Sequence, residues 1–105
     1  GIARRFLHEG GTYGELDTGA TTLSFAQHSI ARPNLGRDYV AADASALPLG
    51  MEIGLATDDV PAAVERAVAA GATLLKPADT KPWGQVVAYV RCPDGTLVEL
   101  CTPMA

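Results

Sequence analysis

Hydrophobic and polar residues follow a regular order through the second half of the chain. Residues 51–56 alternate, with Ile53 and Leu55 on one side, which is the period of a β-strand. From Val60 the apolar residues recur at helical spacing, and Gly71 is a typical helix stop. The other elements predicted in this half are a short strand at 73–77, a loop at 78–84, and strands at 85–91 and 96–102. The predicted order is therefore strand, helix, strand, strand, strand.

The last two predicted strands form a hairpin, and its register decides which side chains share a face. Pro93 and Gly95 suit a type I turn followed by a left-handed glycine. This turn places Tyr89 opposite Glu99. One face then carries Val87, Tyr89, Arg91, Leu97, Glu99 and Cys101, and the other carries Ala88, Val90, Val98 and Leu100. Because the second set is apolar throughout, we expect it to pack on the helix.

The first half of the chain predicts an antiparallel meander followed by a connector. The expected strands are at 2–8, 13–16 and 20–27. Residues 28–50 contain two Pro and two Gly and show no sustained period, so we expect a long connector with a short helical turn within 39–46. The third strand resembles the last strand of the chain in position and pattern, which indicates a weak internal repeat.

Composition excludes several classes of protein. The chain has 105 residues, the size of one small domain, and 48% of them are hydrophobic, which is too many for a disordered segment. No run approaches the roughly 18 apolar residues that a membrane-spanning helix needs. The net charge of −4 speaks against a nucleic-acid surface, which needs a basic stripe. We therefore expect neither a membrane nor a nucleic acid as a partner.

The two cysteines indicate the redox environment. Cys92 is predicted to lie opposite Thr96, several rungs of the hairpin away from Cys101, which is poor geometry for a disulfide. The chain starts at Gly1 inside a hydrophobic run, without a signal-peptide pattern. We expect reduced thiols and a cytoplasmic location.

Four segments of the second half together resemble a known superfamily. They are Glu-Ile-Gly-Leu-Ala-Thr-Asp-Asp-Val at 52–60, Ala-Ala-Gly-Ala at 69–72, Pro-Trp-Gly-Gln at 82–85, and Tyr-Val-Arg-Cys-Pro-Asp-Gly-Thr-Leu-Val-Glu-Leu at 89–100. The combination resembles the vicinal oxygen chelate superfamily, which includes glyoxalase I, bleomycin-resistance proteins, fosfomycin-resistance enzymes and extradiol dioxygenases. The resemblance covers residues 51–103 closely and residues 2–27 loosely.

The resemblance implies an α+β fold of paired βαβββ modules, each with a cupped mixed sheet. Residues 1–28 would be the end of a first module that lacks its opening strand and helix, 29–50 a connector, and 51–105 a complete second module. An incomplete module would leave a sheet edge and an apolar face uncovered. We therefore expect unseen residues or a partner chain to complete it, and a homodimer as the assembly.

The resemblance also implies where a metal would be held. Metal-dependent members place one ligand in the first strand and one in the last strand of each module, and Glu52 and Glu99 occupy these positions in the second module. The last-strand position of the first module holds Ser24, a poor metal ligand, and neither His8 nor His28 falls on a matching position. We therefore expect no cofactor. The alternative is one divalent metal such as Zn, Ni, Mn or Fe on Glu52 and Glu99.

The residues expected to bind a ligand are Ser24, Glu52, Trp83, Tyr89, Arg91 and Glu99. Glu52 and Glu99 are also the candidate catalytic residues, because facing carboxylates repel, which raises the pKa of one of them and suits it to be a general base. A competing interpretation makes Glu99 a structural carboxylate paired with Tyr89 or Arg91. Trp83 either packs as a lid on the module junction or stacks on a ligand. The residues expected to be surface groups only are Arg4, Arg5, His8 and His28.

The function predicted from this resemblance is binding of a small organic molecule in a cup-shaped pocket, independent of metal, as in bleomycin-resistance proteins. The alternative is a divalent-metal-dependent lyase or isomerase of the glyoxalase I type. Fold alone does not decide between them.

Overall fold

The computed structural model describes residues 4–7 and 10–103 of the chain. The chain divides into two compact units between Tyr39 and Val40. Three residues of the first predicted strand, Ile2, Ala3 and His8, lie outside the described residues. The module boundaries predicted after residues 28 and 50 stay predictions.

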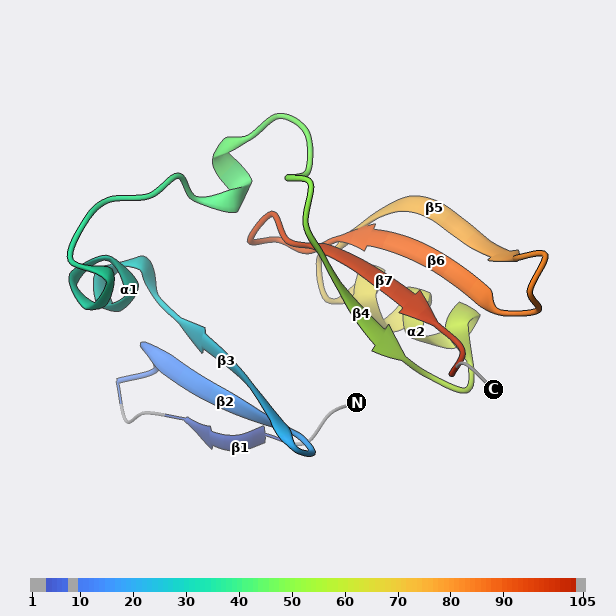
Figure 1. Ribbon diagram of the computed structural model, residues 1–105, viewed down its shortest axis with the longest axis horizontal. Helices are drawn as coiled ribbons and strands as arrows, with labels where there is room; N and C mark the ends of the chain where they lie inside the picture. Colours follow the sequence, from blue (N-terminus) through green and yellow to red (C-terminus); the bar gives the residue numbers. More distant parts are fainter. Residues whose placement is uncertain (1–3, 8–9, 104–105) are drawn as a thin grey trace. The chain divides into compact units, whose positions relative to one another are not determined.

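The second unit has the predicted order of elements. These are β4 (Glu52–Ala56), α2 (Val60–Ala69), β5 (Thr73–Thr80), β6 (Val86–Arg91) and β7 (Leu97–Cys101). The strands form one sheet in the order β4-β7-β6-β5, with β4 parallel to β7 and the other neighbours antiparallel (Figure 1). The sheet is open, with β4 and β5 at its edges. The unit is a βαβββ module, which confirms the predicted α+β fold class.

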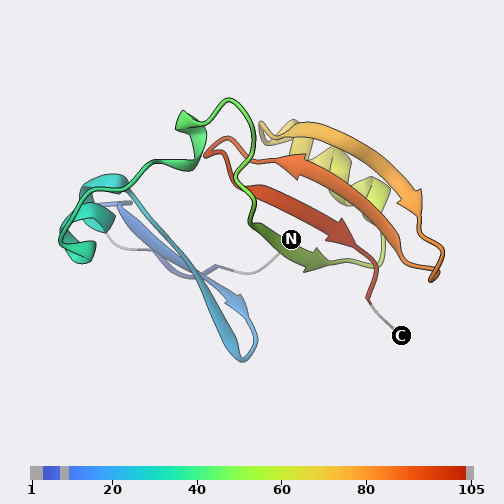
Figure 2. The ribbon, with the colours of Figure 1, turned by 45° about the horizontal axis from the view of Figure 1, so that its top comes forward.

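Helix α2 covers one face of this sheet (Figure 2). It starts where Asp59 Oδ1 accepts a hydrogen bond from the backbone N–H of Ala62 at 3.1 Å, and Pro61 fits its first turn. The buried core between helix and sheet consists of Val60, Ala63, Ala88, Val90, Val98 and Leu100. The apolar face predicted for the hairpin is confirmed, and its burial is the main term that stabilises the unit.

Strand β5 is longer than the sequence predicts. The expected strand ends at Pro77, whereas β5 continues to Thr80 and shortens the following loop. Proline lacks a backbone N–H and breaks the pattern of a central strand, but β5 is an edge strand, where the missing donor can face solvent. Two register shifts against β6, between Leu74 and Lys76 and between Lys76 and Asp79, accommodate the irregular stretch.

The first unit consists of a three-stranded antiparallel sheet and one helix. Its elements are β1 (Arg4–Leu7), β2 (Tyr13–Thr18), β3 (Thr21–Ala26) and α1 (His28–Leu35), with the strands in the order β1-β2-β3. By register, one face of the sheet carries Leu7, Leu16, Leu23 and Phe25. Phe25 on this face is 51% exposed, and the expectation that the module is incomplete stays a prediction.

Helix α1 lies where the sequence predicted a connector with no regular element before residue 39, so the predicted secondary structure is wrong for residues 28–35. The helix was hidden because Pro33 stands inside it and because it has neither a side-chain N-cap nor an acidic first turn. It ends at Gly36, whose φ of 81° is left-handed. The short helical turn predicted within 39–46 is present as a 3-10 helix, Ala42–Ala44. Neither α1 nor α2, the α-helices of the described residues, is long and apolar enough to cross a membrane.

Candidate functional site

The face of the four-stranded sheet that lies opposite α2, which we call the open face, carries most of the predicted site residues. By cross-strand register it holds Glu52, Gly54, Lys76, Asp79, Val87, Tyr89, Arg91, Leu97, Glu99 and Cys101. Glu99 lies opposite Gly54 on one side and Tyr89 on the other, and Tyr89 lies opposite Lys76. The predicted pairing of Tyr89 with Glu99 is confirmed.

Tyr89 and Glu99 form the central polar contact of the open face. The Tyr89 hydroxyl donates a hydrogen bond to Glu99 Oε2 at 2.9 Å. This hydrogen bond, then partial burial and the negative charges of Glu99 and Glu52, raise the pKa of Tyr89 to about 12. Tyr89 is therefore a neutral donor at physiological pH, and Glu99 is its acceptor. The sequence allowed Tyr89 or Arg91 as the partner of Glu99, and in the structure the hydrogen-bond partner is Tyr89.

We expect Tyr89 to keep its phenolic proton well above the ordinary tyrosine range. The unfolded chain loses this proton near pH 10, whereas the folded chain keeps it to about pH 12, so the free energy of unfolding falls as the pH rises through this window. Glu99→Gln removes the charged acceptor and should move the pKa of Tyr89 down toward 10. Site-resolved NMR of labelled tyrosine measures the shift. The control is Glu15→Gln, which removes the acceptor of Tyr13 instead. An equal Tyr89 pKa in wild type and Glu99→Gln would contradict the assignment.

Glu52 lies on the same face as Glu99, on the neighbouring strand β4 and displaced by two residues along the strands. Glu52 pairs with Leu97, and Gly54 pairs with Glu99. Glu52 is exposed, and its charge contributes to raising the pKa of Tyr89. A Cβ added at Gly54 would lie 4.0 Å from Glu99 Oε1, so the glycine leaves the β4 backbone bare beside the carboxylate. The acid–base pairing of the two carboxylates stays a prediction.

The two thiols of the second unit are free. Cys101 is buried on the open face, and burial, then hydrogen bonding to Glu99, raises its pKa. Burial, then the charge of Asp94, raises the pKa of Cys92. Both groups therefore stay protonated thiols at neutral pH, and a protonated thiol is a poor nucleophile. They belong to the packing of the unit rather than to its chemistry.

Arg91 contacts the backbone of the segment that precedes β4. Its Nη2 donates to the carbonyls of Ala42 at 3.0 Å and Ser45 at 2.8 Å. Its Nη1 donates to the carbonyl of Ala46 at 3.3 Å, and its Nε donates to that of Gly95 at 3.2 Å. The guanidinium therefore fastens residues 42–46 to the β6–β7 turn. A role of Arg91 in ligand binding stays a prediction.

A group of charged residues at the β5 side was missed by sequence reasoning. Lys81 Nζ lies 3.1 Å from Asp79 Oδ2, and Lys76 Nζ lies 3.9 Å from the same oxygen. Hydrogen bonding to Asp79 is the largest cause that raises the pKa of Lys81, and the charge of Glu99 adds to it. The only signal in the sequence was the alternation of charges after Pro77, which the predicted loop concealed.

Trp83 lies in the loop between β5 and β6. Its Nε1 donates to Gln85 Oε1 at 2.9 Å, and Gln85 Nε2 donates to the backbone carbonyl of Thr102 at 2.9 Å. These contacts anchor the indole nitrogen, while 63% of the residue is exposed. The ring can therefore meet a ligand or another surface, and both interpretations of Trp83 stay open.

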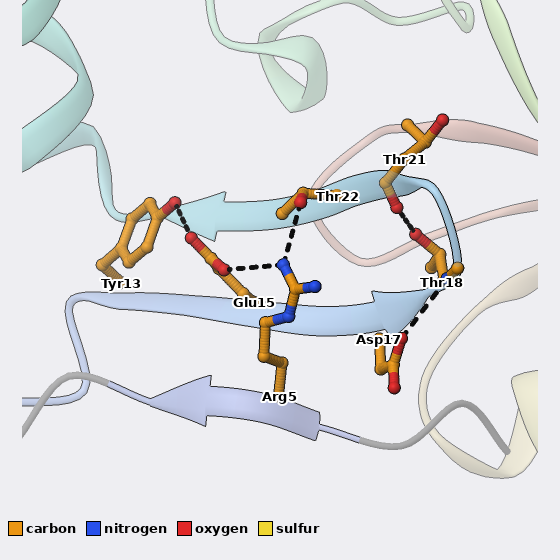
Figure 3. A network of polar contacts seen from close by, with 8 residues as sticks. Arg5, Tyr13, Glu15, Asp17, Thr18, Thr21 and Thr22 are labelled. Carbon is orange, nitrogen blue, oxygen red and sulfur yellow. Dashed lines mark hydrogen bonds and ion pairs between the residues drawn. The ribbon is translucent and has the colours of Figure 1, made fainter.

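Ser24, the predicted site residue of the first unit, is exposed on β3 opposite Glu15. Glu15 is the centre of a polar network (Figure 3). It accepts a hydrogen bond from the Tyr13 hydroxyl at 2.8 Å and lies 3.6 Å from Arg5 Nη1, which also donates to Thr22 Oγ1 at 3.0 Å. Arg5 is therefore not merely a solvated charge, because it links the three strands. The role of Ser24 in a binding site stays a prediction.

His28 was expected to be a surface residue at a strand end and instead is the first residue of α1. It is exposed, and its Nδ1 forms a hydrogen bond with the Tyr39 hydroxyl. The guanidinium of Arg32 lies 4.8 Å from the centre of the Tyr39 ring. These contacts hold the end of the first unit against α1. His8 lies outside the described residues.

The residues of the open face do not form a complete metal site. Glu52 and Glu99 supply carboxylates, which suit a divalent cation. Within residues 4–7 and 10–103, no group of three or more His, Cys, Asp or Glu side chains lies close enough to hold a metal ion. A protein site normally supplies three or four ligands, so these two carboxylates alone do not fit the metal that the alternative requires.

Comparison with known proteins gives one family and a set of similar structures. A family model described as a glyoxalase-like domain matches residues 11–101. A glyoxalase-related enzyme from Fulvimarina pelagi is 25% identical with a TM-score of 0.78, over 97% of this chain and 70% of that chain. No curated protein matches the chain.

Two further solved structures are similar in fold. A glyoxalase/bleomycin resistance protein/dioxygenase family enzyme from Burkholderia phytofirmans is 21% identical with a TM-score of 0.61, over 89% of this chain and 72% of that chain. A bleomycin resistance determinant encoded on the transposon Tn5 is 20% identical with a TM-score of 0.59, over 100% of this chain and 81% of that chain.

Proposed function

The chain belongs to the family of glyoxalase-like domains, and from this premise we propose that it binds a small organic molecule on the open face without a metal. The observation that carries the proposal is the Tyr89–Glu99 pair, a carboxylate held in place by a phenol on the sheet face opposite α2. A fixed, partly exposed acceptor costs little conformational entropy when a ligand donates to it.

The surrounding residues supply what a binding face needs. Glu52 adds a second, exposed acceptor beside Glu99, and the bare backbone at Gly54 lets a ligand approach the two carboxylates. The ring of Tyr89 and the exposed indole of Trp83 offer apolar surface. Arg91 holds residues 42–46 at the β6–β7 turn, so that this segment forms the border of the open face there.

The alternative function is a divalent-metal-dependent lyase or isomerase. It is supported by the description of the Fulvimarina pelagi structure as a glyoxalase-related enzyme and by Glu52 and Glu99 on one sheet face, which the sequence resemblance implies to be ligand positions. Metal analysis of the purified protein separates the two functions. A metal content below about a tenth of an equivalent, with no gain after reconstitution, contradicts the lyase, whereas a full equivalent of bound Zn, Ni, Mn or Fe contradicts metal-independent binding.

The test of binding is a ligand-observed NMR screen with a library of small organic molecules. We expect the hits to perturb the amides of Tyr89 and Glu99, and Glu99→Gln to weaken their binding at least about tenfold, because a hydrogen bond to a charged acceptor contributes about 1.5 kcal/mol or more. The matched control is Glu65→Gln on the exposed side of α2, which should change nothing. The proposal fails when no molecule perturbs the open face, or when both variants bind equally well.

The proposal also includes a homodimer and a cytoplasmic location. The apolar face that carries Phe25 supports a second subunit, because large exposed apolar side chains on one face are typical of protein interfaces. The free thiols of Cys92 and Cys101 support a reducing compartment. Light scattering of the purified protein tests the dimer, and a monomeric mass at micromolar concentration would contradict it.

A further inference from the structure

Two glutamates and two lysines gather at opposite sides of the open face. Glu52 and Glu99 lie on β4 and β7, at one side. Lys76 and Lys81 lie on β5 and just after it, at the other side. The uncharged phenol of Tyr89 on β6 stands between the two groups. We call the side with Glu52 and Glu99 the acidic half and the side with Lys76 and Lys81 the basic half.

Neither half is neutralised by its own partners. In the basic half, Lys76 and Lys81 share the single carboxylate of Asp79, which leaves about one positive charge. In the acidic half, Glu99 is held by the neutral Tyr89 hydroxyl rather than by a cation. The nearest guanidinium on the same face, Arg91, donates instead to backbone carbonyls. Both halves can therefore attract a charge of opposite sign.

The strand order sets the distance between the two halves. Neighbouring strands lie about 4.8 Å apart, so β7 and β5 are about 10 Å apart and β4 and β5 about 14 Å apart. Long lysine and glutamate side chains shorten the gap that a ligand must bridge. A compact α-amino acid is too short to reach both halves, whereas a flexible chain with a charge at each end can do so.

We propose that the ligand of the open face is dipolar, with an ammonium group beside Glu52 and Glu99 and a carboxylate or similar oxyanion beside Lys76 and Lys81, separated by a chain of several atoms. This inference rests on the proposed function and adds the ligand's chemical class to it. The bare backbone at Gly54 lets the ammonium end reach the acidic half, since no side chain stands there beside Glu99. The Tyr89 ring supports the apolar middle of the ligand.

The test uses three probes of the same length: 6-aminohexanoate, hexylamine and hexanoate. We expect NMR titration of the whole protein to show 6-aminohexanoate binding up to about fivefold more tightly than either single-charge probe, because each exposed ion pair contributes up to about 1 kcal/mol. Glu52→Gln should weaken hexylamine and 6-aminohexanoate but not hexanoate. Lys81→Gln should weaken hexanoate and 6-aminohexanoate but not hexylamine. Each variant thus carries its own control for folding.

Two outcomes overturn the inference while leaving the proposed function intact. One is equal affinity for 6-aminohexanoate and a single-charge probe. The other is no binding of any of the three by a protein whose open face still binds a molecule from the screen. Failure of every molecule to perturb the open face overturns the proposed function itself.

Discussion

Replacement of Gly95 by alanine should destabilise the second unit by about 3 kcal/mol. Gly95 is buried and has a φ of 93°, a left-handed conformation that costs a residue with a Cβ about 1 kcal/mol. The added Cβ would also lie 2.4 Å from Ala42 C and from Asp43 N. Because these are backbone atoms, the segment must move, and overpacking of this kind costs about 2 kcal/mol more. Chemical denaturation of wild type and variant measures the difference.

The matched control for this prediction is Gly84→Ala. Gly84 has a φ of 94°, almost the same as that of Gly95, but a Cβ there meets nothing within 4 Å. The control therefore carries the conformational cost alone, about 1 kcal/mol. The excess loss in Gly95→Ala measures the contact with residues 42 and 43. Equal losses in the two variants would show that this contact does not hold in solution.

The final hairpin is the part of the fold that the sequence predicted best. A turn with Pro93 and Gly95 at fixed positions permits one register, and that register pairs Tyr89 with Glu99 and sorts the apolar residues onto one face. Local turn chemistry and the two-residue period of a strand agree here, so no tertiary information is needed. The positions of Glu52 and Glu99 on one face followed from the same alternation.

Sequence reasoning failed where tertiary contacts override local preference. Pro33 and the missing cap concealed α1, and Pro77 concealed the second half of β5, although the edge position of β5 tolerates a proline. Asp79 was consequently placed in the loop, and its neighbour Lys81 was left out of the candidate site. Three of the four partners of Arg91 could not be predicted either, because they are backbone carbonyls 45 to 49 residues away, which leave no signature in the side-chain pattern.

The two units use the same contact in different ways. In the first unit Tyr13 donates to Glu15, and the two residues are neighbours along the same face of β2. In the second unit Tyr89 donates to Glu99 across two strands. Glu15 is also ion-paired with Arg5, whereas Glu99 has no cation at hydrogen-bond distance among the described residues. For this reason the carboxylate of the second unit is the better acceptor for a ligand, and the one in the first unit is a structural link.

Arg91→Met should destabilise the second unit by about 2 kcal/mol and release residues 42–46 from the sheet. The substitution keeps the apolar stem of the side chain and removes four hydrogen bonds to carbonyls. Hydrogen bonds from a charged donor contribute about 1.5 to 3 kcal/mol each, but the freed carbonyls can bind water, so the net loss is smaller than their sum. The amide of Ala44, which donates to the Ala41 carbonyl at 3.0 Å, should exchange its hydrogen faster.

The control for a general loss of charge is Arg66→Met at an exposed position of α2, which should change the stability by less than about 0.5 kcal/mol. The sharper test is the double variant Arg91→Met with Gly95→Ala. Both single changes act by displacing residues 42–46, and a segment already displaced by the new Cβ has little left to lose when the guanidinium is removed. The double variant should therefore lose about 1 kcal/mol less than the sum of the single losses. Strict additivity would mean that Arg91 and Gly95 stabilise the unit independently, and that the segment is not held as one piece.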